Sequence, residues 1–372
     1  MNFIFALFIF SILLQLGFYL FFQRNLSIYH NSPPKKGEKN PVSVIICAKD
    51  EAENLQNFLP YIYEQDYPVF EVVLIDDRSK DDKTWNIMQN FKEKFPSRTR
   101  VVRVEYSDNP RFIGNKKYAL TLGIKAAKHD YLLFTDADCR PVTNKWIDRM
   151  ASAFTEKKDL VLGYGKYKQK KGLLNLLIRY ETLQTAIQYF SYAIAGLPYM
   201  GVGRNLAYKK KLFFDNNGFY HHMDILSGDD DLFVNAAGNK ENTSVCMDPG
   251  AFTMSLPEEK WKKWIYQKRR HISTAKYYKT KHKFLLAIYY FSLFAFYFSA
   301  FFLLVNHYQW KIVAALIILR YSVTYFIQKN WAMQLREEGL TPYLFFLEPL
   351  LILFQLYIFI VNLFFKPKTW AN

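Results

Sequence analysis

The hydrophobic positions of the chain form short uninterrupted runs in its middle and much longer runs near both ends. The short runs have the length of strands buried on both faces of a parallel sheet. Between them apolar residues recur every three or four positions, which indicates helices. We expect strands at residues 42–47, 72–75, 101–105, 131–135 and 161–167, and helices at 55–64, 83–95, 115–128 and 144–154. This alternation predicts an α/β domain with right-handed βαβ units and a mostly parallel, Rossmann-like sheet.

The long apolar runs have the length of membrane spans. Residues 3–22 are interrupted only by Ser11, Gln15 and Gly17, and a run of this length crosses a bilayer as one helix. A cleaved signal peptide is the alternative, but no basic residue precedes the run and no small-x-small site follows it. We therefore expect a retained anchor, followed by three further candidate spans at 284–305, 312–328 and 343–365.

These patterns divide the chain into four expected parts. The parts are an anchor at 1–23, an α/β domain at 41–257, an aromatic and basic interfacial region at 258–283, and C-terminal transmembrane helices at 284–365. Residues 173–197 predict a further amphipathic helix, which suits either the membrane interface or a packed core.

The net charge of +16 raises the question of a nucleic-acid partner. Basic residues crowd positions 260–283, however, directly before the second apolar block, where anionic lipid headgroups would meet them. The sequence also lacks a nucleic-acid recognition motif. We expect the membrane, and no nucleic acid, as a partner.

The basic residues also predict an orientation. Those that follow the anchor place the α/β domain in the cytoplasm by the positive-inside rule, namely Arg24, Lys35, Lys36 and Lys39. The expected location is a bacterial inner membrane. Four spans would leave Lys366 and Lys368 outside, against this rule, and a segment within 284–328 that enters and returns on one side would restore it.

The spacing of the three cysteines does not indicate a metal site or a disulfide. Cys47, Cys139 and Cys246 are widely separated and match neither a metal-binding nor a disulfide spacing. They fit a reducing compartment.

Acidic residues follow several of the expected strands. Asp136 and Asp138 end the run YLLFTDAD, Asp76 and Asp77 follow the second strand, and Glu51 follows the first. In open α/β sheets ligands bind beyond the carboxyl ends of the strands, so these carboxylates can hold a divalent cation that carries phosphates. Solvated strand exits and a helix N-cap are the structural alternatives. Dinucleotide and P-loop sites are disfavoured because the sequence has no Gly-rich phosphate loop.

Two later motifs add candidate chemistry. The sequence GDDD at 228–231 supplies carboxylates for a general base, or merely an acidic helix N-terminus. The aromatic and basic stretch 258–278 suits a bilayer surface, and its arginines can hold a diphosphate bidentately.

Taken in order, the motifs CAKDEAEN, IDDRSKD, GNKKYAL, TDAD, GVGRN, GDDD and QKRRH resemble those of the membrane-bound family-two inverting glycosyltransferases. The resemblance covers residues 41–278. It implies a GT-A fold and a sugar transfer from a nucleotide-sugar, here expected to be a UDP-sugar, to a lipid or lipid-linked glycan acceptor.

The resemblance also implies a role for individual residues. It places Ala48, Glu51 and Asp77 around the nucleoside, with Asp77 on the uracil edge. Lys116 would approach the donor near its diphosphate, and Asp136 would bind the nucleotide-sugar as part of the D-x-D motif. Gln267 and Arg270 would lie near the diphosphate and the acceptor. Asp138 would bind Mg²⁺ or Mn²⁺, and Asp230 would be the base that deprotonates the acceptor.

Two departures from the family pattern limit the resemblance. His271 stands where processive members have Trp, which places a polymer synthase in doubt, and the inserted Asn115 leaves open whether Lys116 or Lys117 fills the lysine role. The alternatives to a single-step transferase are a processive polysaccharide synthase coupled to export and a catalytically inactive membrane scaffold. The complete acidic set argues against the scaffold.

Overall fold

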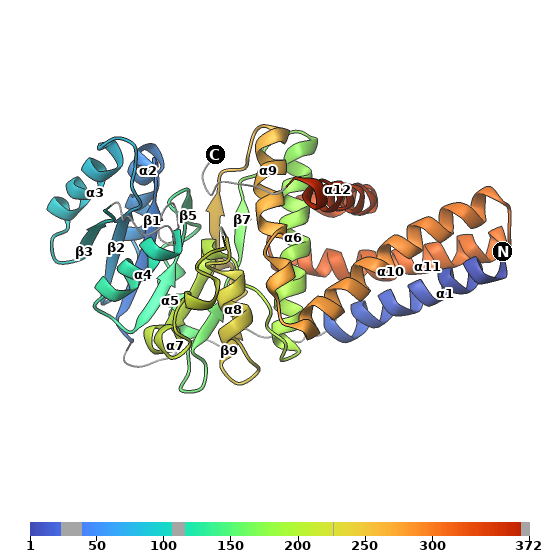
Figure 1. The fold of residues 1–372 in the computed structure, drawn as a ribbon, viewed down its shortest axis with the longest axis horizontal. Helices are drawn as coiled ribbons and strands as arrows, with labels where there is room; N and C mark the ends of the chain where they lie inside the picture. Colours follow the sequence, from blue (N-terminus) through green and yellow to red (C-terminus); the bar gives the residue numbers. More distant parts are fainter. Residues whose placement is uncertain (24–38, 106–115, 226, 366–372) are drawn as a thin grey trace.

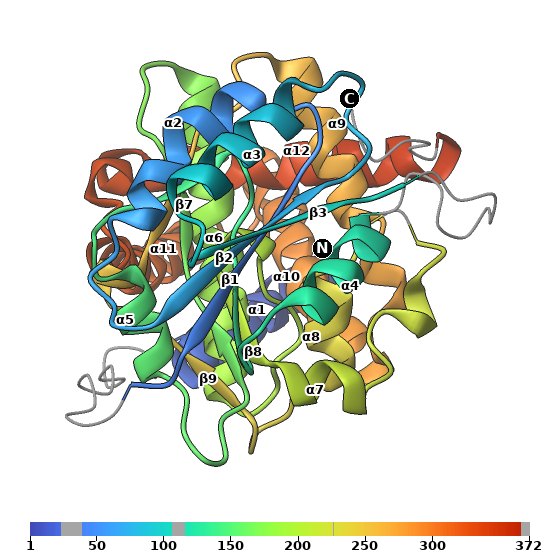
Figure 2. The same ribbon diagram turned by 90° about the vertical axis from the view of Figure 1, so that its left-hand side faces the viewer.

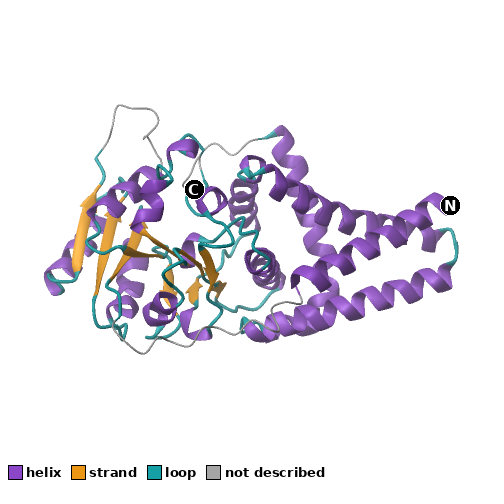
Figure 3. Ribbon diagram, turned by 90° about the horizontal axis from the view of Figure 1, so that it is seen from below, coloured by secondary structure: helices purple, strands orange, loops and turns teal. Residues whose placement is uncertain are grey.

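The computed structural model describes residues 1–23, 39–105, 116–225 and 227–365. The molecule is elongated, with all its strands at one end and a bundle of helices projecting from the other (Figures 1 and 3). Several residues of the sequence argument lie outside the described ranges: Arg24, Lys35, Lys36, Gly114, Asn115, Lys366 and Lys368.

Seven strands form the main sheet, in the order β3-β2-β1-β4-β8-β6-β9. The first four in this order are parallel, β8 is antiparallel to both of its neighbours, and β6 and β9 are parallel to each other. The expected α/β architecture with a mostly parallel sheet is therefore confirmed. The strands are β1 (Val42–Ala48), β2 (Phe70–Asp76), β3 (Thr99–Arg103), β4 (Tyr131–Phe134), β6 (Leu160–Leu162), β8 (Leu206–Lys209) and β9 (Thr243–Val245).

Strand β1 separates two hydrophobic cores, which explains why it carries apolar residues on both of its faces. Val44 and Ile46 pack with residues of α2 (Ala52–Tyr63) and α3 (Lys83–Lys94) on one side of the sheet. On the other side, Ile45 and Cys47 pack with residues of α4 (Lys116–Ala126), α6 and the helices beyond. Every position of β1 and β2 is buried, as the apolar runs predict. The strands lie side by side between these helices in Figure 2.

The single strand expected at 161–167 is wrong. The chain forms β6 there and then β7 (Gly165–Tyr167), which belong to different sheets. Gly163 between them donates its N–H to Asn205 O at 3.0 Å, and a Cβ on Gly163 would lie 2.6 Å from the Asn205 side chain. The break therefore depends on a contact with a residue distant in sequence. β7 joins a second sheet, in the order β5-β10-β7, with β5 (Cys139–Pro141) and β10 (Thr253–Ser255).

Helix α6 (Leu173–Ile194) lies between the sheets and the helical bundle (Figure 1). Most of its residues are buried, including the polar Arg179 and Gln188. Of the two placements that its sequence allowed, the packed core is the one observed. α9 (Trp261–Ile272) lies beside α6, and Lys268 of α9 pairs with Glu181 of α6 at 2.5 Å.

Four helical segments are long and apolar enough to cross a membrane, in agreement with the four candidate spans: Asn2–Gln23, Thr280–Val305, Trp310–Gln334 and Glu338–Phe364. The first comprises α1 (Asn2–Gly17) and the π-helical turn η1 (Phe18–Gln23), and the last comprises η7 (Glu338–Tyr343) and α12 (Leu344–Phe364). α1, α10 (Thr280–Val305) and α11 (Trp310–Gln334) run side by side away from the sheets, whereas α12 runs across their direction beside α6 and α9 (Figures 1 and 2).

Candidate active site

The acidic residues expected at the strand ends meet at one edge of the main sheet. Ala48 ends β1 in register with Asp76 at the end of β2, and Phe134 at the end of β4 pairs with Ile45 of β1. Because these strands are parallel, the residues that follow them reach the same edge. A cleft opens there, and its lining includes Cys47, Lys116, Asp136, Gly203, Asp229 and Asp230.

Asp136 and Asp138 fit a divalent cation. Asp136, Asp138 and Cys139 each offer one ligand atom, and these three atoms lie within 4.8 Å of one another. Carboxylate oxygens are the ligands that Mg²⁺ and Mn²⁺ prefer. The Cys139 thiol donates to Asp138 Oδ1 at 3.2 Å, and burial raises the pKa of this thiol well above its ordinary value. Cys139 thus contacts Asp138 as a hydrogen-bond donor, and its soft sulfur atom is a poorer ligand for Mg²⁺ or Mn²⁺ than the carboxylates are. Burial and the neighbouring Asp136 raise the pKa of Asp138, a cost that a bound cation would offset.

Lys116 joins this carboxylate pair to the aspartates that follow Gly228. Its Nζ lies 2.8 Å from Asp136 Oδ1 and 3.1 Å from Asp229 Oδ2. Burial would lower the pKa of Lys116, but the two carboxylates outweigh it and raise the pKa well above its ordinary value. The ammonium group is thus kept charged in the cleft.

The neighbouring Lys117 has a different environment. It is buried and donates to the backbone O of Ile225, and burial lowers its pKa to about 8. It is not part of the cleft lining, whereas Lys116 is. Between the two lysines that the sequence left open, the structure places Lys116 in the cleft.

The three consecutive aspartates have three different environments. Asp229 faces Lys116, and although burial would raise its pKa, Lys116 and Lys117 hold the pKa below its ordinary value. Asp231 is buried and accepts from Thr274 Oγ1 and from Tyr278 OH at 2.7 Å, so it ties α8 (Asp231–Ala237) to the segment after α9. Asp231 is therefore a structural residue.

Asp230 is the aspartate with the properties of a general base. It caps α8 by accepting the N–H of Asp231 at 2.7 Å, and its other oxygen accepts the N–H of Gly203 at 2.7 Å. Burial, followed by the charges of Asp229 and Asp231, raises the pKa of Asp230 to about 7. A carboxylate with a pKa near neutrality that lines the cleft can accept a proton from a hydroxyl group.

Asp77 and Glu51 lie at the ends of β2 and β1. Asp77 is fully buried and accepts from Arg78 Nε at 2.9 Å through one oxygen, while its Oδ2 has no hydrogen-bond partner among the described residues. A buried acceptor without a donor suits the N–H of a ligand. Glu51 accepts from Asn54 Nδ2 at 2.6 Å, and burial raises the pKa of Glu51.

The residues expected on α9 are close to the aspartate run but do not line the cleft. Gln267 and Arg270 are half-buried, and Gln267 Oε1 has no hydrogen-bond partner in the described part of the chain. His271 is exposed at the C-terminal turn of α9. Its carbonyl oxygen accepts from Thr274 Oγ1 at 2.7 Å, the hydroxyl that also reaches Asp231. The structure thus brings Lys116, Asp136 and Asp230 together in the lining of one cleft. The other expected site residues do not belong to this lining: Ala48, Glu51, Asp77, Asp138, Gln267 and Arg270.

Two charged residues of this region were not singled out from the sequence. Asp229 pairs with Lys116. The guanidinium group of Arg204 lies 4.3 Å from the centre of the Tyr167 ring, and its Nη1 lies 3.4 Å from Ser255 Oγ. The charge of Arg204 lowers the pKa of Asp138, against the effect of burial. The motif GVGRN contains this arginine.

Comparison with known proteins relates part of the chain to glycosyltransferases. Residues 43–214 match glycosyl transferase family 2. Glycosyltransferase AglE of Haloferax volcanii is 30% identical over 116 residues, which are 31% of this chain and 35% of that protein. The match thus spans about a third of the length of this relative.

A solved structure covers nearly the whole chain. The mannosyltransferase PcManGT from Pyrobaculum calidifontis, in complex with GDP-Man and Mn²⁺, superposes with a TM-score of 0.61 at 19% identity, over 97% of this chain and 98% of that one. The likeness establishes the fold, which is GT-A-like with additional apolar helices.

Proposed function

We propose that this chain, whose residues 43–214 match glycosyl transferase family 2, transfers a sugar from a nucleotide-sugar to a membrane-associated acceptor with inversion of configuration. The observation that carries the proposal is the cleft itself. Asp230, whose pKa is raised to about 7, lines it together with Lys116 and Asp136. A base, a cation and a metal-binding carboxylate are the groups that an inverting transfer requires.

Each group has a task in the proposed reaction. Asp230 takes the proton of the acceptor hydroxyl as this oxygen attacks the sugar carbon. Lys116 lies where it can stabilise the charge that develops on the leaving diphosphate. Asp136 and Asp138 would hold Mg²⁺ or Mn²⁺, which neutralises the diphosphate when bound. Gly203 keeps the Asp230 carboxylate oriented through its N–H.

The nucleoside would lie over the ends of β1 and β2. Asp77 Oδ2, which has no hydrogen-bond partner among the described residues, is the proposed acceptor for a base N–H. Ala48 lies at the adjacent end of β1, and Glu51 follows it by three residues. Uracil offers one such N–H, and guanine offers an N–H and an amino group, so the acceptor suits a UDP-sugar and a GDP-sugar alike. The family resemblance favours UDP, whereas the structural neighbour binds GDP-Man. Gln267 and Arg270 would approach the diphosphate from α9.

The acceptor is proposed to be a lipid or a lipid-linked glycan. The four apolar helical segments support a position of the cleft next to a bilayer, and the basic residues of 258–283 would fit its anionic surface. The proposed division of the chain is an anchor at 1–23, a transferase domain at 41–257, an interfacial region at 258–283 and membrane helices at 284–365. The transferase domain is proposed to face the cytoplasm of a bacterial cell.

The test is a transfer assay with the full chain in membranes. Labelled UDP-sugars and GDP-sugars are incubated with the protein and a lipid extract, and lipid-extractable label is counted. We expect label with at least one donor, and none with Asp230→Asn. Equal transfer by the Asp230→Asn variant, or no transfer from any donor of the panel, would overturn the proposal.

A further inference from the structure

We propose that α12 does not cross the membrane but lies in its surface on the side of the catalytic domain, so that α1, α10 and α11 are the only spans among the described helices. This inference rests on the membrane placement in the proposed function and not on the transfer reaction. It concerns a segment that length and composition mark as a span like the other three.

The first observation is the direction of α12. α1, α10 and α11 pack side by side and project together from the sheets, so their common direction is the direction in which the bundle would cross a bilayer. α12 runs across this direction at the base of the bundle, in contact with α6 and α9 (Figures 1 and 2). A helix that lies across a spanning bundle lies in the plane of the membrane.

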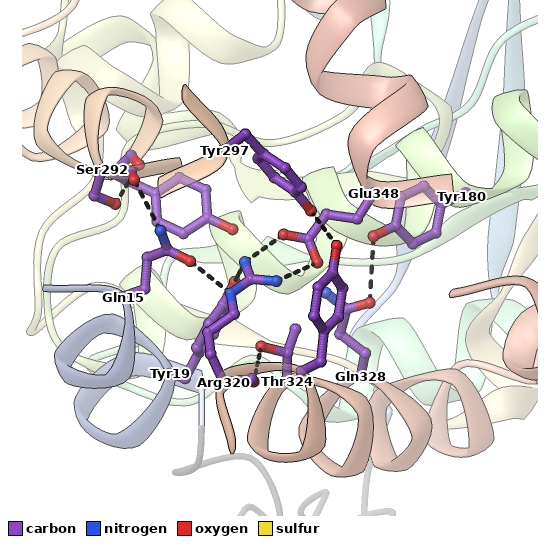
Figure 4. Close-up of polar contacts among 11 residues, drawn as sticks. Gln15, Tyr19, Tyr180, Ser292, Tyr297, Arg320, Thr324, Gln328 and Glu348 are labelled. Atoms are coloured by element: carbon purple, nitrogen blue, oxygen red, sulfur yellow. Dashed lines mark hydrogen bonds and ion pairs between the residues drawn. The ribbon is translucent and has the colours of Figure 1, made fainter. Parts of the chain in front are cut away.

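The second observation is a buried ion pair near the start of α12 (Figure 4). Arg320 of α11 is completely buried, and it donates to Glu348 Oε2 at 2.9 Å through Nη1 and again to Glu348 through Nη2. The same guanidinium donates to Gln15 Oε1 at 2.7 Å and to Tyr19 OH at 2.9 Å. Because an unpaired charge is costly in an apolar environment, this network holds the start of α12 against α1, η1 and α11.

The third observation is that the rest of α12 is held by the catalytic domain. Asn362 near its end exchanges two hydrogen bonds with Arg269 of α9, from Arg269 Nε at 2.9 Å and to Arg269 O at 3.0 Å. In its middle, Phe354 stacks on Trp264 of α9 with ring centres 4.2 Å apart. With both ends and the middle held at the base of the bundle, α12 has no free end that could reach the opposite leaflet.

The connection before α12 is also held on the catalytic side. Glu337, which precedes η7, is buried and accepts from Arg179 Nε of α6 at 2.8 Å, and Lys166 of β7 lies 3.6 Å from its other oxygen. These contacts fix the end of α11 to α6 and β7. α12 therefore starts on the side of the bundle where the catalytic domain lies.

The outer face of α12 is apolar along its whole length. Nine of its residues are exposed, with exposed fractions between 39% and 75%. Six of them recur every three or four positions, namely Phe346, Leu350, Leu353, Tyr357, Ile360 and Phe364, and the other three, Phe345, Phe359 and Leu363, widen this face on one side. The polar Glu348 and Asn362 lie on the opposite face, toward the protein. An exposed face that is apolar along its whole length suits the acyl chains of a bilayer, and lipid is therefore the proposed occupant.

The arrangement also corrects the charge balance. With three spans instead of four, Lys366 and Lys368, which follow α12 in the sequence, stay on the same side as the catalytic domain, in agreement with the positive-inside rule. The re-entrant segment within 284–328 that would have restored the balance is then unnecessary, since α10 and α11 form a plain hairpin.

The test measures the depth of spin labels in nanodiscs of phosphatidylethanolamine and phosphatidylglycerol. Labels are placed on the full chain at Phe346→Cys, Leu353→Cys and Ile360→Cys, with Phe298→Cys on the exposed side of α10 as the deep control. The native cysteines are buried, and the unsubstituted chain gives the background. We expect similar shallow depths at all three α12 positions and a deeper label at 298.

A depth that rises to a maximum at Leu353→Cys would show that α12 spans and would overturn the proposal. Labels shielded from both oxygen and the polar relaxation agent would also overturn it, since a second protein copy would then cover the stripe. As an independent check, an impermeant maleimide should label Asn372→Cys and Asn306→Cys from opposite sides. Labelling of both from one side would contradict three spans. Since no donor is present in either experiment, the outcome is separate from that of the transfer assay.

Discussion

Lys116 Nζ lies 2.8 Å from Asp136 Oδ1, which places a permanent cation directly beside the carboxylate pair at the end of β4. The same ammonium group reaches Asp229 at 3.1 Å, so it bridges the two acidic segments of the cleft. Without a bound nucleotide-sugar, Asp136 and Asp229 form ion pairs with the ammonium group of Lys116. When a diphosphate enters, its oxygens would compete for the same ammonium.

The first prediction is that Lys116→Ala abolishes most of the transfer. Removal of one preorganised cation at a developing negative charge costs about 10²–10³-fold in turnover. We expect this loss in the initial rate of sugar transfer. Lys125→Ala, at an exposed position on the same helix, is the matched control and should retain full activity. A Lys116→Ala enzyme within threefold of the control would show that Lys116 has no part in transfer.

The second prediction concerns the protonation of Asp230. Because burial and the flanking carboxylates raise its pKa to about 7, the base is protonated and inactive at lower pH and ionised at higher pH. The transfer rate should therefore rise with pH up to about 7 and level off above. Asp230→Asn should lose turnover at every pH and still bind the donor, as measured by calorimetry. The exposed Asp215→Asn on α7 (Lys210–Asp215) is the control.

The third prediction is that Asp138→Asn weakens metal-dependent donor binding. One of the two hard carboxylate ligands is lost, and the neutral amide is a poorer ligand for Mg²⁺ or Mn²⁺. We expect titrations followed by electron paramagnetic resonance to show that Mn²⁺ binds more weakly to this variant than to the unsubstituted chain. Full transfer by the unsubstituted enzyme in excess chelator would contradict any role for a cation here.

The fourth prediction tests the buried ion pair between α11 and α12. Glu348→Gln leaves the fully buried Arg320 charge without its carboxylate, which costs about 3–5 kcal/mol for a buried pair. We expect a clear drop in Tm in detergent. Glu338→Gln, whose partner Arg336 lies 3.8 Å away at the surface, should cost less than about 1 kcal/mol.

A double substitution separates pairing from packing. Replacing both Arg320 and Glu348 with Met removes the charges and keeps an apolar contact, so it should recover part of the lost Tm. If Glu348→Gln and Glu338→Gln lower the Tm equally, the pair contributes no more than a surface pair.

The sequence predicts the parts of this structure that depend on local pattern. β1, β2 and β4 follow from buried apolar runs, and Asp136 and Asp138 follow from their position after such a run. The break between β6 and β7 could not be predicted, because it depends on the packing of Asn205 against Gly163. The different environments of Asp229, Asp230 and Asp231 likewise come from tertiary neighbours. The direction of α12 could not be predicted from the sequence either, since a helix across the bundle and a helix along it can have the same composition.

The fifth prediction is that the enzyme adds one sugar or a few rather than a long polymer. The resemblance places a Trp of processive enzymes at position 271, where a flat apolar ring can stack on a sugar. Here the residue is His271, exposed at the end of α9. We expect short, lipid-extractable products when the labelled material from the full chain is sized on a gel.

His271→Trp and the matched control Tyr277→Trp, an exposed aromatic position shortly after α9, test the cause. If a stacking platform is what the site lacks, His271→Trp should lower the KM for the glycan-bearing acceptor, and Tyr277→Trp should leave it unchanged. Product length should stay short in both, because a polymer also needs a passage through the membrane, and the described residues offer at most four helices that could line one. A long water-soluble ladder from the unsubstituted enzyme would contradict this prediction, since it would mean that chain extension proceeds without an indole at position 271.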